Sequence, residues 1–403
     1  MKTVDEHLAD ILAATRELAP LELALLEAVN GVLAEPATAP VDLPPFDNSA
    51  MDGYAVVAAD VAGASEHAPV TLSVIGDIAA GDQEAHGIRP GICVRIMTGA
   101  PVPAGADAIV PVEWTDGGTA KVTIRRAATA GNYVRRSGED VTVGQTVLPE
   151  GTRLGAAQIG MLAAIGRSRV LVRPRPRVVV LSTGSELVEP GSPVGPGQIW
   201  DANGFALTAA ATEAGGVGFR QGVIGDEDPG RVLSAIEEQL GFADLVITSG
   251  GVSMGARDVV KEVLSGLGTM RFDKVAMRPG KPQGFGLLDD HTPVFTLPGN
   301  PVSAYVSFQV FVRPALRALQ GLPPDPLPTV VARVTEPVRS PPGLRHFLRG
   351  ALEYRDGVYH VSPAEGQGSH QIFSLASSNC LIVVSEDVTS LATGDPVDVM
   401  MLP

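Results

Sequence analysis

Two glycine- and serine-rich phrases follow predicted strands between residues 175 and 320, and their residue types suit the binding of an anion. One reads Ser182-Thr183-Gly184-Ser185-Glu186, and the other reads Ser249-Gly250-Gly251-Val252-Ser253. Glycines let backbone N–H groups turn toward a ligand, and serine hydroxyls add donors. A tight turn explains either phrase alone. Because ligands of open α/β sheets bind beyond the carboxyl ends of strands, the two phrases together favour a phosphate or oxyanion site.

A third phrase at the same edge begins a predicted helix and reads Leu297-Pro298-Gly299-Asn300-Pro301-Val302-Ser303. Asn300 suits the N-cap and Pro301 the first helical position, and the free N–H groups there attract oxyanions. The sequence contains neither GxGxxG nor GxxxxGK[ST], so we expect no dinucleotide or Walker-type site.

Three cations, Lys274, Arg278 and Lys281, surround a Pro-Gly turn. Such charges form strong hydrogen bonds with oxyanions. A solvated basic hairpin is the alternative, but the neighbouring glycine-rich phrases favour an anion site. Arg345, Arg349 and Ser369 are further candidates for phosphate contacts, with a structural surface role as the alternative.

Four carboxylates, Glu186, Asp201, Asp226 and Asp258, lie at or near the predicted strand ends. Acidic groups suit an anion pocket only if a divalent cation mediates, and hard carboxylate oxygens suit Mg²⁺. Each could instead cap a helix, and Asp226 and Asp258 are well placed to do so.

A β-rich region contributes loops of polar and small residues that suit close approach to a ligand or to a neighbouring subunit. They are DNSAMDGYA at 47–55, which contains Asp52, MTGAP at 97–101, which contains Thr98, and SGED at 137–140, which ends in Asp140.

The 403 residues predict two to four domains to position these groups. The net charge of −15 argues against general nucleic-acid or anionic-membrane binding. The sequence has no membrane-length apolar stretch, and acidic residues near its start argue against a signal peptide. The two distant cysteines, Cys93 and Cys380, exclude a disulfide framework and a CxxC zinc site. We therefore expect a soluble cytoplasmic protein.

Apolar spacing predicts a helix over 4–18 and a second short one over 21–29. Short β runs at 46–143 predict a small antiparallel domain, and a helix-like stretch lies within 144–173. Strands at 177–182, 217–225 and 244–251 alternate with helices at about 203–215, 229–241 and 257–267, which predicts a mainly parallel sheet covered on both faces. The helix from Pro301 should kink or divide at Pro314. The last 75 or so residues suit a small closed β-barrel.

Together these phrases resemble the molybdopterin molybdenumtransferase family, which includes the E domain of gephyrin. The phrases are DNSAMDGYA, MTGAP, GADAIVPVE, SGED, STGSEL, GDEDP, SGGVSMG, KVAMRPGKP and LPGNPVSA. The resemblance implies an elongated multidomain α/β plus β protein. Its first expected part is an elongated linker and dimerisation domain, residues 1–45 with 144–174, whose first helix is able to pack on the α/β domain. A β-rich domain, residues 46–143, is inserted into it. A molybdopterin-binding, mainly parallel α/β domain (175–322) and a C-terminal β-barrel (323–403) follow.

The resemblance also implies the reaction, in which adenylylated molybdopterin and molybdate give the molybdenum cofactor and AMP with Mg²⁺. It implies a homodimer whose site joins the α/β domain of one subunit to the β domain of the other. It further allows transient contact with the proteins that make and adenylylate molybdopterin. Matched by motif, the site residues are Asp52, Thr98, Asp140, Glu186, Asp226, Asp258, Lys274, Arg278, Lys281, Pro298, Pro301, Arg349 and Ser369.

Within this set, the resemblance gives catalytic roles to Asp258, Asp226, Lys274 and Asp52, and metal contacts to Asp258, Asp226 and Glu186. Many relatives carry Lys where this chain has Arg278, and Arg keeps the charge but presents a planar fork. Three other functions stay open: the adenylyltransferase step that makes the activated pterin, a gephyrin-like binding scaffold, and a paralogue that uses tungstate.

Overall fold

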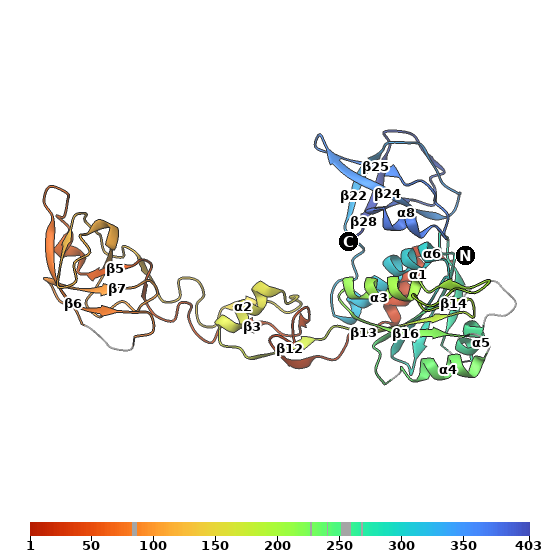
Figure 1. The fold of residues 1–403 in the computed structure, drawn as a ribbon, viewed down its shortest axis with the longest axis horizontal. Helices are drawn as coiled ribbons and strands as arrows, with labels where there is room; N and C mark the ends of the chain where they lie inside the picture. Colours follow the sequence, from red (N-terminus) through yellow and green to blue (C-terminus); the bar gives the residue numbers. More distant parts are fainter. Residues whose placement is uncertain (83–86, 226–227, 240, 251–258, 267–268) are drawn as a thin grey trace. The chain divides into compact units, whose positions relative to one another are not determined.

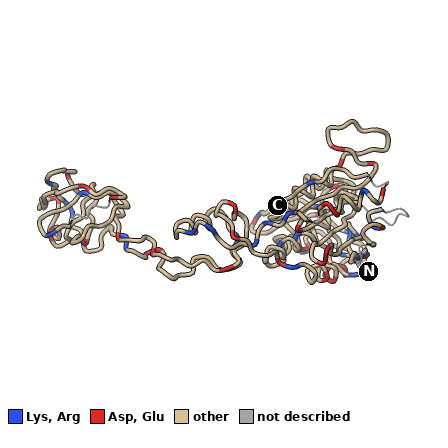
Figure 2. The backbone as a smooth tube through the Cα atoms, turned by 90° about the horizontal axis from the view of Figure 1, so that it is seen from below, with Lys and Arg blue, Asp and Glu red and all other residues tan. Residues whose placement is uncertain are grey.

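The computed structural model describes residues 1–82, 87–225, 228–239, 241–250, 259–266 and 269–403, which form two compact units (Figure 1). The first unit comprises Met1–Leu23, Asn30–Ala34 and Leu171–Pro403, and the second comprises Ala24–Val29 and Glu35–Val170. Acidic and basic residues are interspersed along the backbone of each unit (Figure 2).

A six-stranded sheet in the first unit has the order β16-β13-β17-β21-β20-β18. Its strands are β13 (Arg177–Thr183), β16 (Val217–Ile224), β17 (Leu245–Ser249), β18 (Arg271–Lys274), β20 (Pro282–Leu288) and β21 (Thr292–Leu297). The first four in the spatial order run parallel. Strand β20 is antiparallel to β21 and to β18, so β18 runs in the same direction as the first four. The mainly parallel sheet expected from the sequence is confirmed.

Helices cover both faces of this sheet, because alternate residues of its strands point to opposite sides. Val178 and Val180 pack with α1 (Val4–Ala14), α3 (Asn203–Glu213), α6 (Pro301–Ser307) and α7 (Arg313–Leu319). Val179 and Leu181 pack with α4 (Pro229–Glu237) and α5 (Val259–Ser265). These strands are therefore apolar at nearly every position, as buried parallel strands are.

The helical segment after Pro301 changes its geometry before Pro314, as expected. A π-helical turn, Phe308–Val312, separates α6 from α7. Proline has no N–H, and its ring clashes with the carbonyl four residues earlier in a regular α-helix. The wider turn accommodates Pro314 while the segment stays buried.

A closed β-barrel ends the chain, as the sequence predicts. Its strands are β22 (Thr329–Val334), β24 (Arg345–Arg355), β25 (Val358–Pro363), β26 (Cys380–Val384) and β28 (Pro396–Met401), and the pairing of β24 with β26 closes it. The short strand β19 (Met277–Arg278) pairs with β24, so the segment carrying the three cations is joined to the barrel. The barrel region also contains β23 (Val338–Arg339), α8 (Ile372–Ala376) and β27 (Ser390–Leu391).

The second unit contains a five-stranded sheet of order β8-β5-β7-β6-β9. The strands are β5 (Gly53–Val56), β6 (Val70–Ile78), β7 (Ile92–Ile96), β8 (Ala108–Pro111) and β9 (Lys121–Ile124). The prediction of a purely antiparallel domain is wrong, because β6 and β7 pair in parallel. Shorter pairs join β3 (Ala37–Thr38) to β11 (Thr146–Leu148) and β4 (Asn48–Ser49) to β10 (Val134–Arg135), and α2 spans Ala156–Ala164.

The helix predicted over 21–29 is also wrong. Residues Leu21–Ala24 form β1, and turns follow to Asn30, whose φ is 65°. The remaining short elements are β2 (Val32–Leu33), β12 (Arg169–Arg173), β14 (Leu187–Val188), β15 (Ile199–Trp200) and the 3-10 turns Ala58–Val61 and Val112–Trp114. Within the ranges given above, no helix is long and apolar enough to cross a membrane.

Candidate functional site

The carboxyl ends of β13, β17 and β21 lie side by side in the first unit. Ser182 pairs with Ser249, and Ser249 pairs with Leu297. The Gly250 N–H donates to the Leu297 carbonyl at 3.1 Å, and the Thr183 hydroxyl donates to the Ser249 carbonyl at 3.4 Å. The structure thus brings together the predicted residues Thr183, Gly184, Ser249, Gly250 and Pro298 at one edge of the sheet.

Asn203, at the start of α3, links two of these loops and was not predicted from the sequence. Its amide nitrogen donates to the Ser249 Oγ at 2.8 Å and to the Gly299 carbonyl at 2.7 Å. An asparagine at the start of a helix is a weak signal, because an ordinary helix cap has the same pattern. The two bonds hold the end of β17 beside the loop that precedes α6.

The start of α6 contacts a loop of the barrel. The Asn300 side chain makes no capping hydrogen bond and instead donates to the Ser369 Oγ at 3.0 Å. The Val302 N–H donates to the Ser369 carbonyl at 3.1 Å. The predicted N-cap position of Asn300 and first helical position of Pro301 are confirmed, although the Asn300 side chain does not cap the helix. One N–H group of the expected anion cradle is already used by Ser369. Pro301 is half-buried and Ser303 is buried beside this contact.

Arg349 supports the same barrel loop from within. Its side chain is 1% exposed, and its Nη2 donates to the Gly366 and Gly368 carbonyls at 2.6 and 3.2 Å. Its Nε donates to the Ser374 Oγ at 2.7 Å, and burial lowers the pKa of the guanidinium. These donors hold the backbone next to Ser369, which favours the structural alternative, and a phosphate contact of Arg349 stays a prediction.

The cationic turn, residues Lys274–Lys281, lies at the same sheet edge. Lys274 pairs with Pro282, and Gly284 two residues further along β20 pairs with Thr296 near the end of β21. The Lys274, Arg278 and Lys281 side chains are exposed, and none of them forms an ion pair or hydrogen bond with another described residue. Three positive charges that have no partner among the described residues therefore lie at the sheet edge that carries the glycine-rich loops.

The turn itself is held by buried polar contacts. The Val275 N–H donates to the Lys281 carbonyl at 2.8 Å and closes it. Gly280 has a φ of +94°, a conformation that favours glycine, and the Gln283 amide donates to its carbonyl at 2.6 Å. The same amide donates to the Ser307 Oγ at 2.6 Å. The three charged side chains therefore extend from a backbone segment that is already ordered without a ligand.

His346 is a second residue that the sequence did not indicate. It pairs in register with Arg278 across β19 and β24 and is 6% exposed. Burial, followed by the charges of Arg278 and Arg349, lowers the imidazole pKa to about 4. His346 is therefore neutral at physiological pH beside the cationic turn.

The carboxylates differ in what they contact. Asp201 is 1% exposed and accepts hydrogen bonds from Ser182, Gly204 and Arg220. The Gly204 N–H lies in the first turn of α3, so of the two roles left open for Asp201 these contacts favour the helix cap. The Ser182 hydroxyl is correspondingly fully buried and directed at Asp201. Glu186 is exposed, and its carboxylate lies against Gly184 at the end of β13.

Four predicted site residues, Asp226, Gly251, Ser253 and Asp258, lie outside the described residues. The N-cap of α4 is Asp228, whose carboxylate accepts the Gly230 N–H at 2.8 Å. In the described ranges, no cluster of three or more His, Cys, Asp or Glu side chains could hold a metal ion. Of the three carboxylates expected on the metal, only Glu186 is described.

Asp52 and Thr98 of the second unit are in direct contact. The Asp52 Oδ1 accepts the Thr98 N–H at 2.7 Å and the Thr98 hydroxyl at 2.9 Å. These two bonds lower the pKa of Asp52, so its exposed carboxylate is ionised at neutral pH. The loops around them are also joined, because Ser49 donates to the Ala100 carbonyl and Gly99 donates to the Ser49 carbonyl.

Asp140 lies in a different loop of the second unit. Its backbone N–H donates to the Leu43 carbonyl at 2.9 Å, and its side chain is exposed. A pocket of about 220 Å³ lies beside Asp52 and is lined in part by Met97 and the Arg95–Asp77 ion pair. The predicted loops of this region therefore do present polar side chains at the surface.

Three family models match the chain. They are described as the MoeA N-terminal region (domain I and II), a probable molybdopterin binding domain, and the MoeA C-terminal region (domain IV), and they match residues 2–166, 179–318 and 331–402.

Curated proteins and a solved structure resemble the chain over nearly its whole length. The chain is 46% identical to molybdopterin molybdenumtransferase 2 of Mycobacterium tuberculosis over 99% of both chains. It is 37% identical to the molybdopterin molybdenumtransferase of Haemophilus influenzae over 94% of this chain and 92% of the other. The crystal structure of the molybdopterin biosynthesis MoeA protein from Pyrococcus horikoshii superposes with a TM-score of 0.81 at 34% identity, covering 99% of this chain and 98% of that one.

Proposed function

This chain belongs to the molybdopterin molybdenumtransferase family, and we propose that its first unit binds adenylylated molybdopterin and molybdate beside the cationic turn. The chain is a transferase of molybdenum cofactor biosynthesis that inserts molybdenum into molybdopterin. The adenylylated form of the pterin and the release of AMP are proposals. One observation supports them: three cations without a partner among the described side chains share a sheet edge with the Thr183, Ser249 and Gly250 loops.

The charges of the turn suit both substrates. Molybdate and the pyrophosphate link of an adenylylated pterin are anions, and Lys274, Arg278 and Lys281 offer donors that no other described side chain satisfies. Because Gln283 and the Val275–Lys281 bond already order the turn, little reorganisation is needed when the substrates bind. The residues position the two substrates and neutralise charge as AMP departs, and no side-chain nucleophile is required.

Mg²⁺ dependence is part of the proposal. An exposed carboxylate at a strand end is chemically suited to Mg²⁺, and Glu186 is the described member of a set that would include Asp226 and Asp258. The ion would offset negative charge on the pyrophosphate link. Glu186 is the member of this set that lies among the described residues. The roles proposed above for the cationic turn do not depend on the ion.

We propose that the enzyme acts as a homodimer, in which Asp52, Thr98 and Asp140 of one subunit complete the site of the other. The ionised Asp52 carboxylate, held by Thr98, supports this proposal because it is exposed and already ordered. Transient contacts with the proteins that make and adenylylate the pterin, and a cytoplasmic location, stay predictions. The thiols of Cys93 and Cys380 are free and buried, as suits a reducing compartment.

The test supplies adenylylated molybdopterin, molybdate and Mg²⁺ and measures AMP and the molybdenum cofactor. Lys274→Ala and Lys281→Ala should each lower kcat/KM by about 10- to 100-fold, since a hydrogen bond to a charged group contributes about 1.5–3 kcal/mol. The matched control is Lys121→Ala, an exposed lysine on β9 of the second unit, which should react as the unmodified protein does.

Activity of both site variants at the control level would refute the proposed site. Adenylylation of free molybdopterin from ATP by the unmodified protein would instead favour the adenylyltransferase alternative. Equal turnover with tungstate in place of molybdate would show that the site does not select between the two oxyanions.

A further inference from the structure

Residue Lys2 pairs with the start of the cationic turn. Its backbone N–H donates to the Lys274 carbonyl at 3.1 Å, and its carbonyl accepts the Ala276 N–H at 2.8 Å. These bonds form a parallel bridge between Lys2 and Val275. Lys2 therefore continues the sheet pairing where β18 ends, next to a cation that the proposed function places on substrate.

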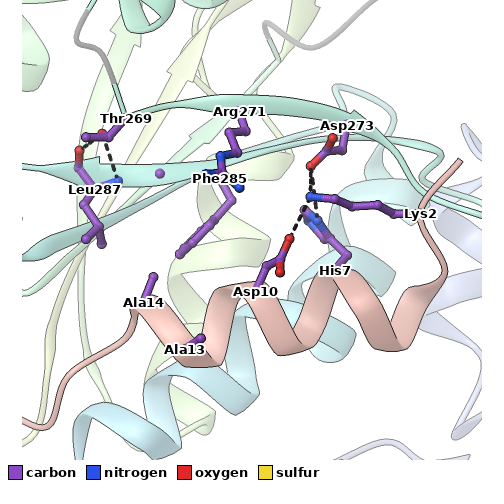
Figure 3. Close-up of a pocket in the computed structure, with 11 residues that line it drawn as sticks. Lys2, His7, Asp10, Ala13, Ala14, Thr269, Arg271, Asp273, Phe285 and Leu287 are labelled. Atoms are coloured by element: carbon purple, nitrogen blue, oxygen red, sulfur yellow. Dashed lines mark hydrogen bonds and ion pairs between the residues drawn. The ribbon is translucent and has the colours of Figure 1, made fainter.

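The Lys2 side chain fixes the residue immediately before Lys274. Its Nζ lies 2.6 Å from the Asp273 Oδ2 and 2.8 Å from the Asp10 Oδ2 (Figure 3). The bonds to Asp10 and Asp273 raise the pKa of Lys2, so the ammonium is charged at physiological pH. Successive side chains of a strand point to opposite faces, so holding Asp273 toward α1 directs Lys274 to the other side.

Apolar packing joins α1 to β20, where Val4, Ile11 and Phe285 share one core, but it leaves a pocket on the side of Asp273. A pocket of about 310 Å³ separates the helix from the strands, between Ala13 and Ala14 of α1 and Phe285 and Leu287 of β20 (Figure 3). Apolar packing therefore does not fix the position of Asp273 here. The ion pair with Lys2 supplies a directional contact in its place.

His7 lies beside the cluster without competing for Asp273. The imidazole is 3% exposed, and its ring meets the Phe311 ring edge-on at 4.8 Å. Its Nδ1 is 3.8 Å from the Asp273 Oδ2, which is beyond hydrogen-bond distance. Burial lowers the imidazole pKa to about 4, so at neutral pH Lys2 is the cation that holds Asp273.

A second contact holds the other side of the same segment. The Arg345 N–H donates to the Ala276 carbonyl at 2.9 Å, and the Arg345 guanidinium forms a two-pronged ion pair with Asp5 at 2.7 and 2.8 Å. Ala276 is thus bound by backbone on both sides, and both flanking residues reach α1 through their side chains. The helix is itself fixed by the Thr3 capping box and by the buried Val4.

We propose that Lys2 is a positioning residue for molybdenum insertion, which orients Lys274 through Asp273. The inference rests on the proposed function of the cationic turn. A charge that is oriented before the reaction stabilises the transition state without the cost of reorganisation. Loss of the Lys2 ammonium should therefore affect kcat more than KM, since the other two cations still attract the substrates.

The experiment compares Lys2→Met, Lys2→Arg, Asp273→Asn and Asp10→Asn in the full chain. Lys2→Met and Asp273→Asn should each lower kcat about tenfold, with less than a threefold change in KM for molybdate. The double variant that combines both substitutions should have a kcat no lower than that of either single variant. Lys2→Arg should restore at least half of the activity. Asp10→Asn removes the charge of the exposed partner of Lys2, so it should lower kcat less than Lys2→Met does. Asp325→Asn, which removes the charge of the exposed partner of Arg317, is the matched control and should react as the unmodified protein does.

Amide hydrogen exchange supplies a readout that does not depend on turnover. Lys2→Met and Asp273→Asn should speed exchange at residues 274–281 at least fivefold, while α4 and the barrel strands are unchanged. Unchanged exchange in this segment, or faster exchange with unchanged kcat, would overturn the positioning role. An unmodified protein that does not insert molybdenum would instead refute the proposed function itself.

Discussion

Asp201 is expected to be the most sensitive carboxylate of the first unit. Its Oδ1 accepts the Ser182 hydroxyl at 2.9 Å and the Gly204 N–H at 2.8 Å, and its Oδ2 accepts the Arg220 Nε and Nη2 at 3.2 and 3.0 Å. Asp201→Asn removes the charge and keeps the shape. If the amide nitrogen faces Arg220, both Arg220 bonds are lost, because neither group can accept. If it faces Ser182, the Ser182 hydroxyl can accept from it, but the Gly204 N–H loses its acceptor.

The expected cost is about 3 kcal/mol of unfolding free energy if the two Arg220 bonds are lost, since a hydrogen bond to a charged group contributes about 1.5 kcal/mol or more. This is at the lower end of the roughly 3–5 kcal/mol for breaking a buried ion pair. The lower end applies because Arg220 keeps its two bonds to Glu189 and its contact with the Phe205 ring.

Urea denaturation followed by fluorescence can measure this loss in the first unit by itself. The chain has two tryptophans, Trp200 in the first unit and Trp114 in the second, so a Trp114→Phe background leaves a single reporter next to Asp201. Asp325→Asn is the matched control, because Asp325 is exposed and lies 3.5 Å from the Arg317 Nη2. It should change stability by less than about 0.5 kcal/mol. A loss below about 1 kcal/mol for Asp201→Asn would refute the reasoning.

Two pH-dependent predictions concern groups on either unit. The pKa of His7 and of His346 is about 4 in the folded protein and about 6.5 after unfolding. The unfolding free energy should therefore fall by about 2 kcal/mol per histidine from pH 8 to 5. In urea denaturation at a series of pH values, His7→Gln should lose about half of this pH dependence of the unfolding free energy. An unchanged pH dependence would contradict the prediction. Thr98→Val removes one of the two bonds that lower the pKa of Asp52, so carbon-13 NMR titration should find that pKa nearer its usual range. An unchanged pKa of Asp52 in Thr98→Val would contradict a hydrogen bond from the Thr98 hydroxyl to this carboxylate.

Much of the fold follows from local patterns in the sequence. The buried run Val178–Leu181 is apolar at every position because its alternate residues face two helical layers, and this indicates a central parallel strand. The run at 21–29 has a helical composition, but pairing with a strand distant in sequence makes Leu21–Ala24 extended. The parallel pairing of β6 with β7 was likewise beyond local patterns, because the direction in which two strands pair is not specified by the apolar spacing within either strand.

The site was predictable where it depends on strand ends and less so where it depends on distant side chains. Lys274, Ser249 and Thr183 each follow or end a strand, so the topology alone brings them to one edge. The Asn203 contact with Gly299 joins residues 96 apart, and no local pattern specifies it. For Arg349 the charge was visible in the sequence, but its burial depends on how the loop at 366–368 folds over it.

The π-helical turn at Phe308–Val312 has a consequence for comparing homologous sequences. A π turn is equivalent to one extra residue in an α-helix, and each residue of an α-helix advances the chain by 1.5 Å and about 100°. A homologue that lacks this residue would form a continuous helix and still present the same face of α7 to the core. Alignments should therefore place a single-residue gap inside this buried helix, where gaps are ordinarily penalised.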